Sequence, residues 1–237
     1  MNAQPSVGED AAGLPPELAL SRLLQLAAAA LPVGAYSYSE GLEHLVEAGR
    51  MGDAGALERW LVDALSYGAP RMEAAVLLRM HRAYADGDSR RALVWDAWLD
   101  ATRDAKELRR QGRDMARALW RLLERIGAGA VAPPGAAAPL TFAAAFAAAA
   151  AAWSIPPRET LVGYLHSWAA NLVGAGVKLI PLGQGAGQAV LWNLNTAVVA
   201  AIDAACELAD EDLDGFSAGA AVAAMRHEEQ YSRLFRS

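Results

Sequence analysis

Helical periodicity runs through almost the whole of this 237-residue chain and constrains its fold more than any other feature. The clearest stretch is 90–126, where apolar or small residues recur three and four residues apart. They are Trp95, Trp98, Thr102, Ala105, Leu108, Gly112, Met115, Leu119, Leu122 and Ile126. This spacing predicts one long amphipathic helix or two collinear helices, with Arg103 and the other charged residues on a solvated face. We find no alternating strand pattern of useful length in the sequence.

Further helices are predicted on both sides of this stretch from apolar periodicity, N-caps such as Asp53, and breakers such as Pro32. They are expected at about 20–31, 54–65, 70–81, 142–153, 157–174, 191–208 and 216–225. Gly174 and Gly176 are expected to end the helix that Pro156 and Pro157 begin. The sequence therefore predicts an all-α fold, a single-domain multi-helix bundle over residues 18–225 with a loop near 127–139. Residues 1–17 are expected to form a flexible acidic leader, and residues 226–237 a C-terminal docking tail.

Composition excludes several classes of protein. The formal net charge of -6 argues against nucleic acid as the main partner. The single cysteine, Cys206, rules out an internal disulfide and fits a reducing compartment. The sequence shows no secretory signal and no uninterrupted apolar run of membrane-spanning length. We therefore expect a cytoplasmic protein with no membrane partner.

Complete catalytic signatures are absent from the sequence. The histidines, His44, His81, His166 and His227, are far apart, and none pairs with Cys206 at the spacing of metal ligands. There is no nucleophile elbow and no phosphate-binding P-loop. The glycine-rich segment 183–187 is interpreted as a turn at a helix N-terminus. The sequence therefore contains no complete catalytic constellation and indicates no cofactor.

One acidic segment leaves an alternative open. Glu40, Glu43, His44 and Glu47 have the spacing that places side chains on one face of a short helix. A histidine among carboxylates can hold a divalent metal, which would make the chain a helical metalloenzyme. A solvated acidic face is the other interpretation of the same pattern.

Three other segments are unusual for a helical bundle. In 31–43, Pro32 and Gly34 interrupt the helical pattern, and Tyr36 and Tyr38 either form a binding surface or pack within the turn. Ser37 or Ser39 is a candidate cap for the helix that follows.

Segments 176–184 and 225–237 are the other two. Lys178 is flanked by apolar residues, so its ammonium must meet either nearby helix carbonyls or another protein. The last residues mix Arg, His, Glu and Tyr with the pair Leu234 and Phe235. That composition is typical of a segment that docks on another protein, although a frayed chain end is the alternative.

These three segments, in this order, resemble the urease accessory protein UreF family. The resemblance rests on Leu31–Gly34 with Tyr36–Ser39 and Gly41–Glu43, on Val177–Gln184, and on Met225–Glu228 with Gln230–Phe235. It spans roughly residues 18–237. Ala35 and Glu229 are mild departures from the residues that the family often has there.

The resemblance implies an all-α, non-enzymatic chaperone that tends to form a homodimer. It implies binding to a second accessory protein, UreD (also called UreH), recruitment of the GTPase UreG, and help with nickel insertion into the urease apoprotein. It places the docking segment at 226–235 and gives Lys178 a part in coupling to the GTPase. The partner-binding residues expected from the resemblance and from the residue patterns are Tyr36, Ser37, Glu43, Lys178, Pro181, Gln184, Arg226, His227, Glu228, Gln230, Tyr231, Arg233, Leu234 and Phe235.

Overall fold

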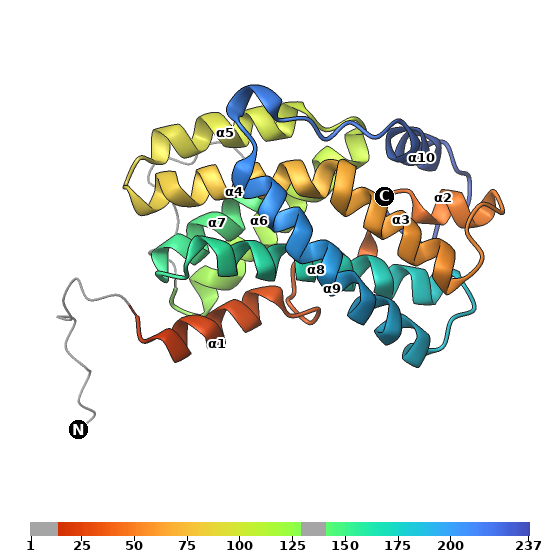
Figure 1. Cartoon of the computed structure of the whole chain (residues 1–237), viewed down its shortest axis with the longest axis horizontal. Coiled ribbons are helices and arrows are strands. Elements are labelled where there is room, and N and C mark those ends of the chain that lie inside the picture. Colours follow the sequence, from red (N-terminus) through yellow and green to blue (C-terminus); the bar gives the residue numbers. More distant parts are fainter. Residues whose placement is uncertain (1–13, 129–140) are drawn as a thin grey trace.

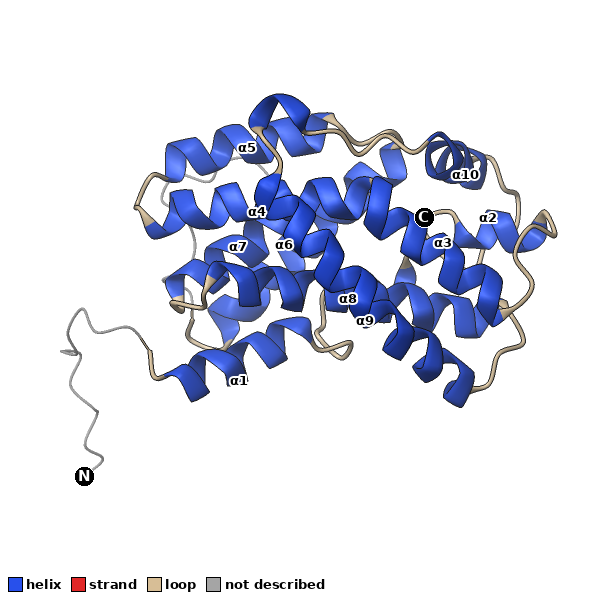
Figure 2. Cartoon of the chain, viewed as in Figure 1, coloured by secondary structure: helices blue, strands red, loops and turns tan. Residues whose placement is uncertain are grey.

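The computed structural model describes residues 14–128 and 141–237, and within these ranges every regular element is helical (Figures 1 and 2). The α-helices are α1 (Pro16–Ala27), α2 (Leu42–Glu47), α3 (Ala54–Tyr67), α4 (Ala69–Ala85), α5 (Ser89–Ala101), α6 (Lys106–Arg125), α7 (Phe142–Ala152), α8 (Pro157–Leu179), α9 (Gln184–Glu207) and α10 (Ala218–Glu228). Two short 3₁₀ turns cover Ala35–Ser37 and Asp210–Asp212. The prediction of an all-α fold is confirmed.

Local sequence accounts for most helix starts. Asp53 caps α3 by accepting a hydrogen bond from the backbone N–H of Ala56 at 2.7 Å, as the sequence predicted. Pro70 lies in the first turn of α4, where its missing N–H costs nothing. Gly183 is the N-cap of α9, and residues 184–187 of the glycine-rich segment form the first turn of this helix.

Helices α4 and α7 form the centre of the core. Nearly every residue of the alanine-rich α7 is buried, and α4 packs against α5, α7, α8 and α9. A helix that is apolar on all sides is stable only when neighbours surround it, and small alanine side chains let those neighbours approach closely. Phe146 is the largest fully buried side chain and packs edge-on against the ring of Tyr164.

The predicted helix over 90–126 is divided into α5 and α6 by a turn at residues 102–105. Ala105 has extended backbone angles, and the Thr102 hydroxyl donates to the carbonyl of Leu99 at 2.9 Å. The turn brings Arg103 inward to a 2.6 Å ion pair with Glu73. The prediction that Arg103 lies on a solvated face is therefore wrong.

The end of α8 also differs from the prediction. Gly174 and Gly176 do not end this helix, which continues to Leu179. A side chain at Gly176 would collide with Leu57 of α3, so this glycine permits close helix packing. The extension places Lys178 in the last turn of α8.

The last helix is α10, which extends to Glu228, so Arg226 lies in its final turn and not in a separate tail. Residues 1–13 of the predicted leader lie outside the described residues, and α1 begins within the rest of it, at Pro16. Most of the predicted loop near 127–139 also lies outside them.

Among the residues that the structure describes, one helix, α9, is long and apolar enough to cross a membrane by length and composition alone. About a third of its apolar window is buried, and it packs along α3, α4 and α8. Core helices of soluble proteins pass the same test, so the finding is weak evidence for a membrane span.

Candidate partner-binding surface

The three unusual segments of the sequence meet at Lys178. Its ammonium lies 5.7 Å from the ring centre of Tyr36 and 5.5 Å from that of Phe235. It also lies 3.4 Å from the backbone carbonyl oxygen of Tyr36. The three residues are more than 140 positions apart along the chain at their widest, yet they form one cluster in space. An ammonium between two aromatic faces gains electrostatic attraction while its side chain stays exposed.

Beside this cluster, the end of the chain folds back on α2 and α6. His227, the penultimate residue of α10, is completely buried. Its ring nitrogens lie 2.9 Å from a carboxylate oxygen of Glu107 and 3.1 Å from one of Glu43. Arg233 forms a further ion pair with Glu107. Two carboxylates from different helices therefore hold the segment that precedes the chain end.

Backbone hydrogen bonds hold the last residues. The N–H groups of Leu234 and Phe235 donate to the two oxygens of Glu43 at 2.6 and 2.9 Å. The N–H of Arg236 donates to the carbonyl of Ser37 at 2.8 Å. The hydroxyl of Ser39 donates to the backbone oxygen of Ser237 at 2.7 Å. Glu43 thus acts as an acceptor for backbone that would otherwise lose its hydrogen bonds on burial.

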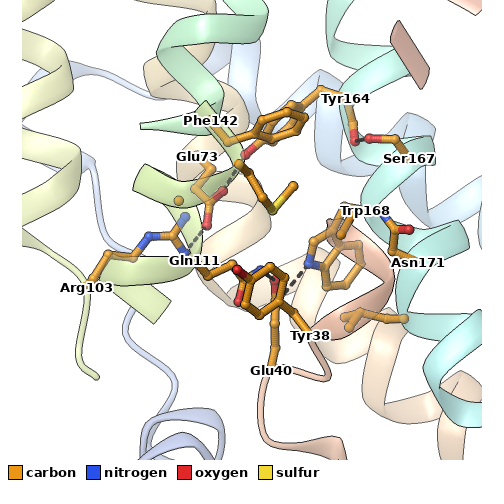
Figure 3. A pocket seen from close by; sticks show the side chains of 14 residues that line it. Tyr38, Glu40, Glu73, Arg103, Gln111, Phe142, Tyr164, Ser167, Trp168 and Asn171 are labelled. Carbon is orange, nitrogen blue, oxygen red and sulfur yellow. Dashed lines mark hydrogen bonds and ion pairs between the residues drawn. The ribbon is translucent and has the colours of Figure 1, made fainter. Parts of the chain in front are cut away.

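A polar cavity of about 50 Å³ (Figure 3) is lined by Glu40 and Gln111, both of which are hydrogen-bonded to Ser237 of this docked segment. Gln111 and Trp168 both donate to the carboxylate of Glu40, at 2.9 and 3.0 Å, and the Ser237 hydroxyl donates to Gln111 at 2.7 Å. Burial, reinforced by the negative charge of Glu73, raises the pKa of Glu40 above its ordinary value. The chain end is therefore hydrogen-bonded to a buried polar network.

On the far wall of the cavity, Tyr164 donates to Glu73 at 2.7 Å, and Glu73 pairs with Arg103 (Figure 3). Burial raises the pKa of the Tyr164 phenol well above its ordinary value, and the Glu73 charge adds to the rise. Since the phenol stays protonated, it remains a hydrogen-bond donor to Glu73. The arrangement is a satisfied structural network, which stabilises the interior without presenting a nucleophile.

Comparison with known proteins supports what the segments suggested. A sequence-family model described as UreF matches residues 51–195, which is more than half of the chain. The chain belongs to the UreF family. The urease accessory protein UreF of Microcystis aeruginosa is 47% identical over 215 residues, covering 91% of this chain and 96% of the relative. Those of Trichormus variabilis and Azoarcus sp. are 47% and 44% identical over 216 and 225 residues, covering 91% and 93% of this chain and 94% and 96% of those relatives.

Membership of the UreF family makes the chain a non-catalytic chaperone of urease maturation. The alternative of a metalloenzyme is wrong, and the geometry explains why its ligand set fails. Glu40 precedes α2 with a φ of 52° and points to Trp168, whereas Glu43 points to the chain end and Glu47 to solvent. The prediction that these residues share one helix face is therefore wrong. Within the described ranges, no group of three or more His, Cys, Asp or Glu side chains is placed to hold a metal.

Some of the expected partner-binding residues of this UreF chain face the interior, and others face solvent. Phe235 is 5% exposed and His227 is fully buried, so both face inward. Tyr231 is fully exposed and Leu234 is 67% exposed. The backbone N–H of Ser37 donates a hydrogen bond to Gly34 within the turn, and its carbonyl oxygen accepts one from the N–H of Arg236.

The other tail residues make polar contacts at the rim. Arg226 pairs with Glu229 at 3.2 Å in the last turn of α10, and Gln230 donates to Glu47. The carboxylate of Glu228 accepts from the backbone N–H of Glu107 at 3.1 Å. Contacts of this exposed kind add little stability but orient the segment.

Pro181 and Gln184 are placed apart from this cluster. Both are exposed at the turn between α8 and α9. Gln184 lines a groove with residues of α1 and α8, including Leu24 and His166. No contact recorded within the described residues brings either of them to the docked chain end.

Sequence reasoning missed Glu107 and Gln111, which hold the chain end from α6. Both lie in a helix rich in charged residues, where the pattern favours a solvated face. Their partners, His227 and Ser237, are 120 and 126 positions away. No local pattern reports a contact at that separation, so only the fold could identify these residues.

Proposed function

We propose that this UreF-family chain is an adaptor that binds the accessory protein UreD/UreH through its C-terminal segment and regulates the GTPase UreG through the surface around Lys178. In this proposal the assembly assists nickel insertion into the urease apoprotein, and nickel is cargo, not a resident cofactor. The adaptor is cytoplasmic and works as a homodimer. The observation that carries the proposal is the meeting of Tyr36, Lys178 and Phe235.

The C-terminal segment has the composition and exposure of a docking surface. Val222, Met225, Tyr231 and Leu234 are 51%, 47%, 106% and 67% exposed. Burying these apolar side chains against a partner would be favourable, because it removes apolar surface from water. The buried His227 and Phe235 hold the segment in place. Tyrosine is a frequent anchor of protein interfaces, and an ordered backbone leaves little conformational entropy to lose on binding.

The Lys178 surface supports the second half of the proposal. The ammonium is exposed, carries no ion pair among the described residues, and is positioned by two rings. A rigid, exposed cation is suited to meet a carboxylate on a partner. Because Phe235 provides one of those rings, the position of Lys178 depends on the docked chain end.

Homodimer formation has separate support on α9. Trp192 and Val199 are 77% and 49% exposed on a helix of mainly apolar residues. Burying such a face against a second copy removes apolar area from water. Sedimentation of Trp192→Ser and the parent chain tests this: the proposal expects a dimer that the substitution weakens.

The tail is tested by co-purification of UreD/UreH with the double variant Tyr231→Ser with Leu234→Ser. The matched control is Tyr67→Ser with Val94→Ser, which removes a tyrosine and an aliphatic side chain that are 71% and 64% exposed elsewhere. We expect the tail variant to lose the partner at unchanged thermal stability and the control to keep it. Retention of UreD/UreH by the tail variant would exclude this docking site.

Lys178 is tested with Lys178→Ala and Lys178→Arg in the assembled complex. We expect the alanine variant to lower urease activation and GTPase recruitment while leaving the melting temperature nearly unchanged, and the arginine variant to recover part of the activation. Equal losses of stability and activation in the alanine variant would show that Lys178 serves only to pack Tyr36 and Phe235.

A further inference from the structure

A second cavity, of about 180 Å³, lies between α3, α6, α8 and α10, beside the polar cavity of Figure 3. The two cavities share Glu40, Arg103, Trp168 and Leu172 as walls. Pockets for drug-sized ligands measure roughly 300–1,000 Å³, so this one has room for a group the size of an amino-acid side chain. Its lining contains neither Lys178 nor a residue of the docking tail.

The charges around this cavity are unbalanced. Three carboxylates line it: Asp63 of α3, Asp104 of the turn before α6, and Glu40. Within the described residues, Asp63 and Asp104 make no ion pair or hydrogen bond, and both are exposed at the mouth. The one cation of the lining, Arg103, is already neutralised by Glu73 at 2.6 Å. Because burial favours the protonated form of Glu40, the net negative charge of the cavity comes from Asp63 and Asp104.

Two indole rings are the aromatic part of a lining that also contains aliphatic residues such as Leu108 and Leu172. Trp60 comes from α3 and Trp168 from α8. The N–H of Trp168 is occupied by Glu40, so this indole offers the ligand its π-system and no donor (Figure 3). Tryptophan faces attract cations more strongly than the other aromatic rings. Aromatic walls with carboxylates at the mouth are the chemistry that recognises an organic cation.

We propose that this cavity binds an ammonium or guanidinium group carried on a short alkyl stem. The stem packs against the rings of Trp60 and Trp168, and the cation reaches Asp63 and Asp104. A metal ion is the poorer fit, because the described residues place no three metal-ligating side chains together. The proposal is independent of the adaptor function, and it covers both a lysine or arginine side chain of a bound protein and a free amine.

The test uses the indole N–H signals of the full-length ¹⁵N-labelled chain. Butylammonium is titrated at constant ionic strength, with butanol as the neutral probe and magnesium chloride as the inorganic cation. Trp120, half-buried on α6 and outside the lining of both cavities, serves as the internal reference for non-specific contact. We expect butylammonium to shift the Trp60 and Trp168 signals saturably, and butanol and magnesium to leave them nearly unchanged.

The variant Asp63→Asn with Asp104→Asn should bind butylammonium roughly fivefold more weakly, because it loses two exposed charge partners. Asp212→Asn, at an exposed position without a recorded side-chain contact, is the matched control and should bind as the parent does. Equal shifts with butanol, equal shifts at Trp120, or undiminished binding by the double variant would each overturn the proposal. A capped Gly-Lys-Gly or Gly-Arg-Gly peptide that competes with butylammonium identifies a protein side chain as the ligand, and failure of both peptides to compete identifies a free amine.

Discussion

Glu43→Gln should release the chain end while leaving the bundle folded. Glu43 is the acceptor for the backbone N–H groups of Leu234 and Phe235, and one of its oxygens also faces His227. Glutamine has the same shape but only one acceptor oxygen, so at least one N–H must face an NH₂ group. A buried donor without an acceptor is costly, and the whole segment depends on this carboxylate.

The size of the effect follows from these contacts. Hydrogen bonds to a charged group contribute about 1.5–3 kcal/mol each, and the side chain of Glu43 is only 11% exposed, so solvent screens them little. Losing one bond outright and weakening another should cost about 2–4 kcal/mol of local stability. At about 1.4 kcal/mol for each factor of ten, opening of the segment becomes roughly 30- to 1,000-fold more frequent.

Amide hydrogen exchange measures this opening directly. The amides of Leu234 and Phe235 should exchange faster by that factor, while those of Leu77 in the core of α4 should not change. Glu47→Gln, with the same charge change in the same helix but an exposed contact to Gln230, should alter exchange by less than about fivefold. Unchanged exchange at Leu234 and Phe235, or equal acceleration at Leu77, would refute the role given to Glu43.

Three further changes test the interior. Burial raises the pKa of Glu40, so above about pH 4.5 the folded state still holds a proton that the unfolded chain has released. The free energy of unfolding therefore falls as pH rises from there through the raised pKa of Glu40. Glu40→Gln should flatten this fall, measured as urea denaturation midpoints across pH. Gly176→Ala drives a Cβ into Leu57 and should lower stability by about 1–3 kcal/mol, seen as a lower melting temperature; an increase would show that α3 can yield. Arg103→Ala leaves Glu73 buried without its partner and should cost about 3–5 kcal/mol in urea denaturation, a loss that adding Glu73→Gln should partly reverse.

Local sequence was sufficient to predict the helices, because periodicity and caps act within one or two turns. The break between α5 and α6 was not decided, since the apolar stripe keeps its phase across residues 102–105. The predicted helix end at Gly174 and Gly176 was wrong, because a glycine in a helical pattern can mark either a helix end or a close contact between helices. The contact of Gly176 with Leu57 on another helix decides between them.

The candidate surface was predictable only in part. Lys178, Tyr36 and Tyr38 could be predicted as candidates, because a lysine among apolar residues and two tyrosines in an interhelical turn are unusual in a helical bundle. Their meeting was not predictable, because Tyr36 and Phe235 lie in segments far apart in the sequence. The same limit applies to Tyr38, which looked exposed but is buried, with burial raising the pKa of its phenol.

The alternation at the chain end gives the tail two separable purposes. Leu234 is exposed, Phe235 buried, Arg236 exposed and Ser237 buried. Each inward residue fixes the direction of its outward neighbour, because successive side chains of a stretched backbone point to opposite sides. Substituting inward residues should therefore lower both local stability and partner binding, whereas substituting outward residues should lower binding alone. If the tail only covered the bundle, substitution at every position would lower stability. If the tail only docked on a partner, substitution at no position would lower stability.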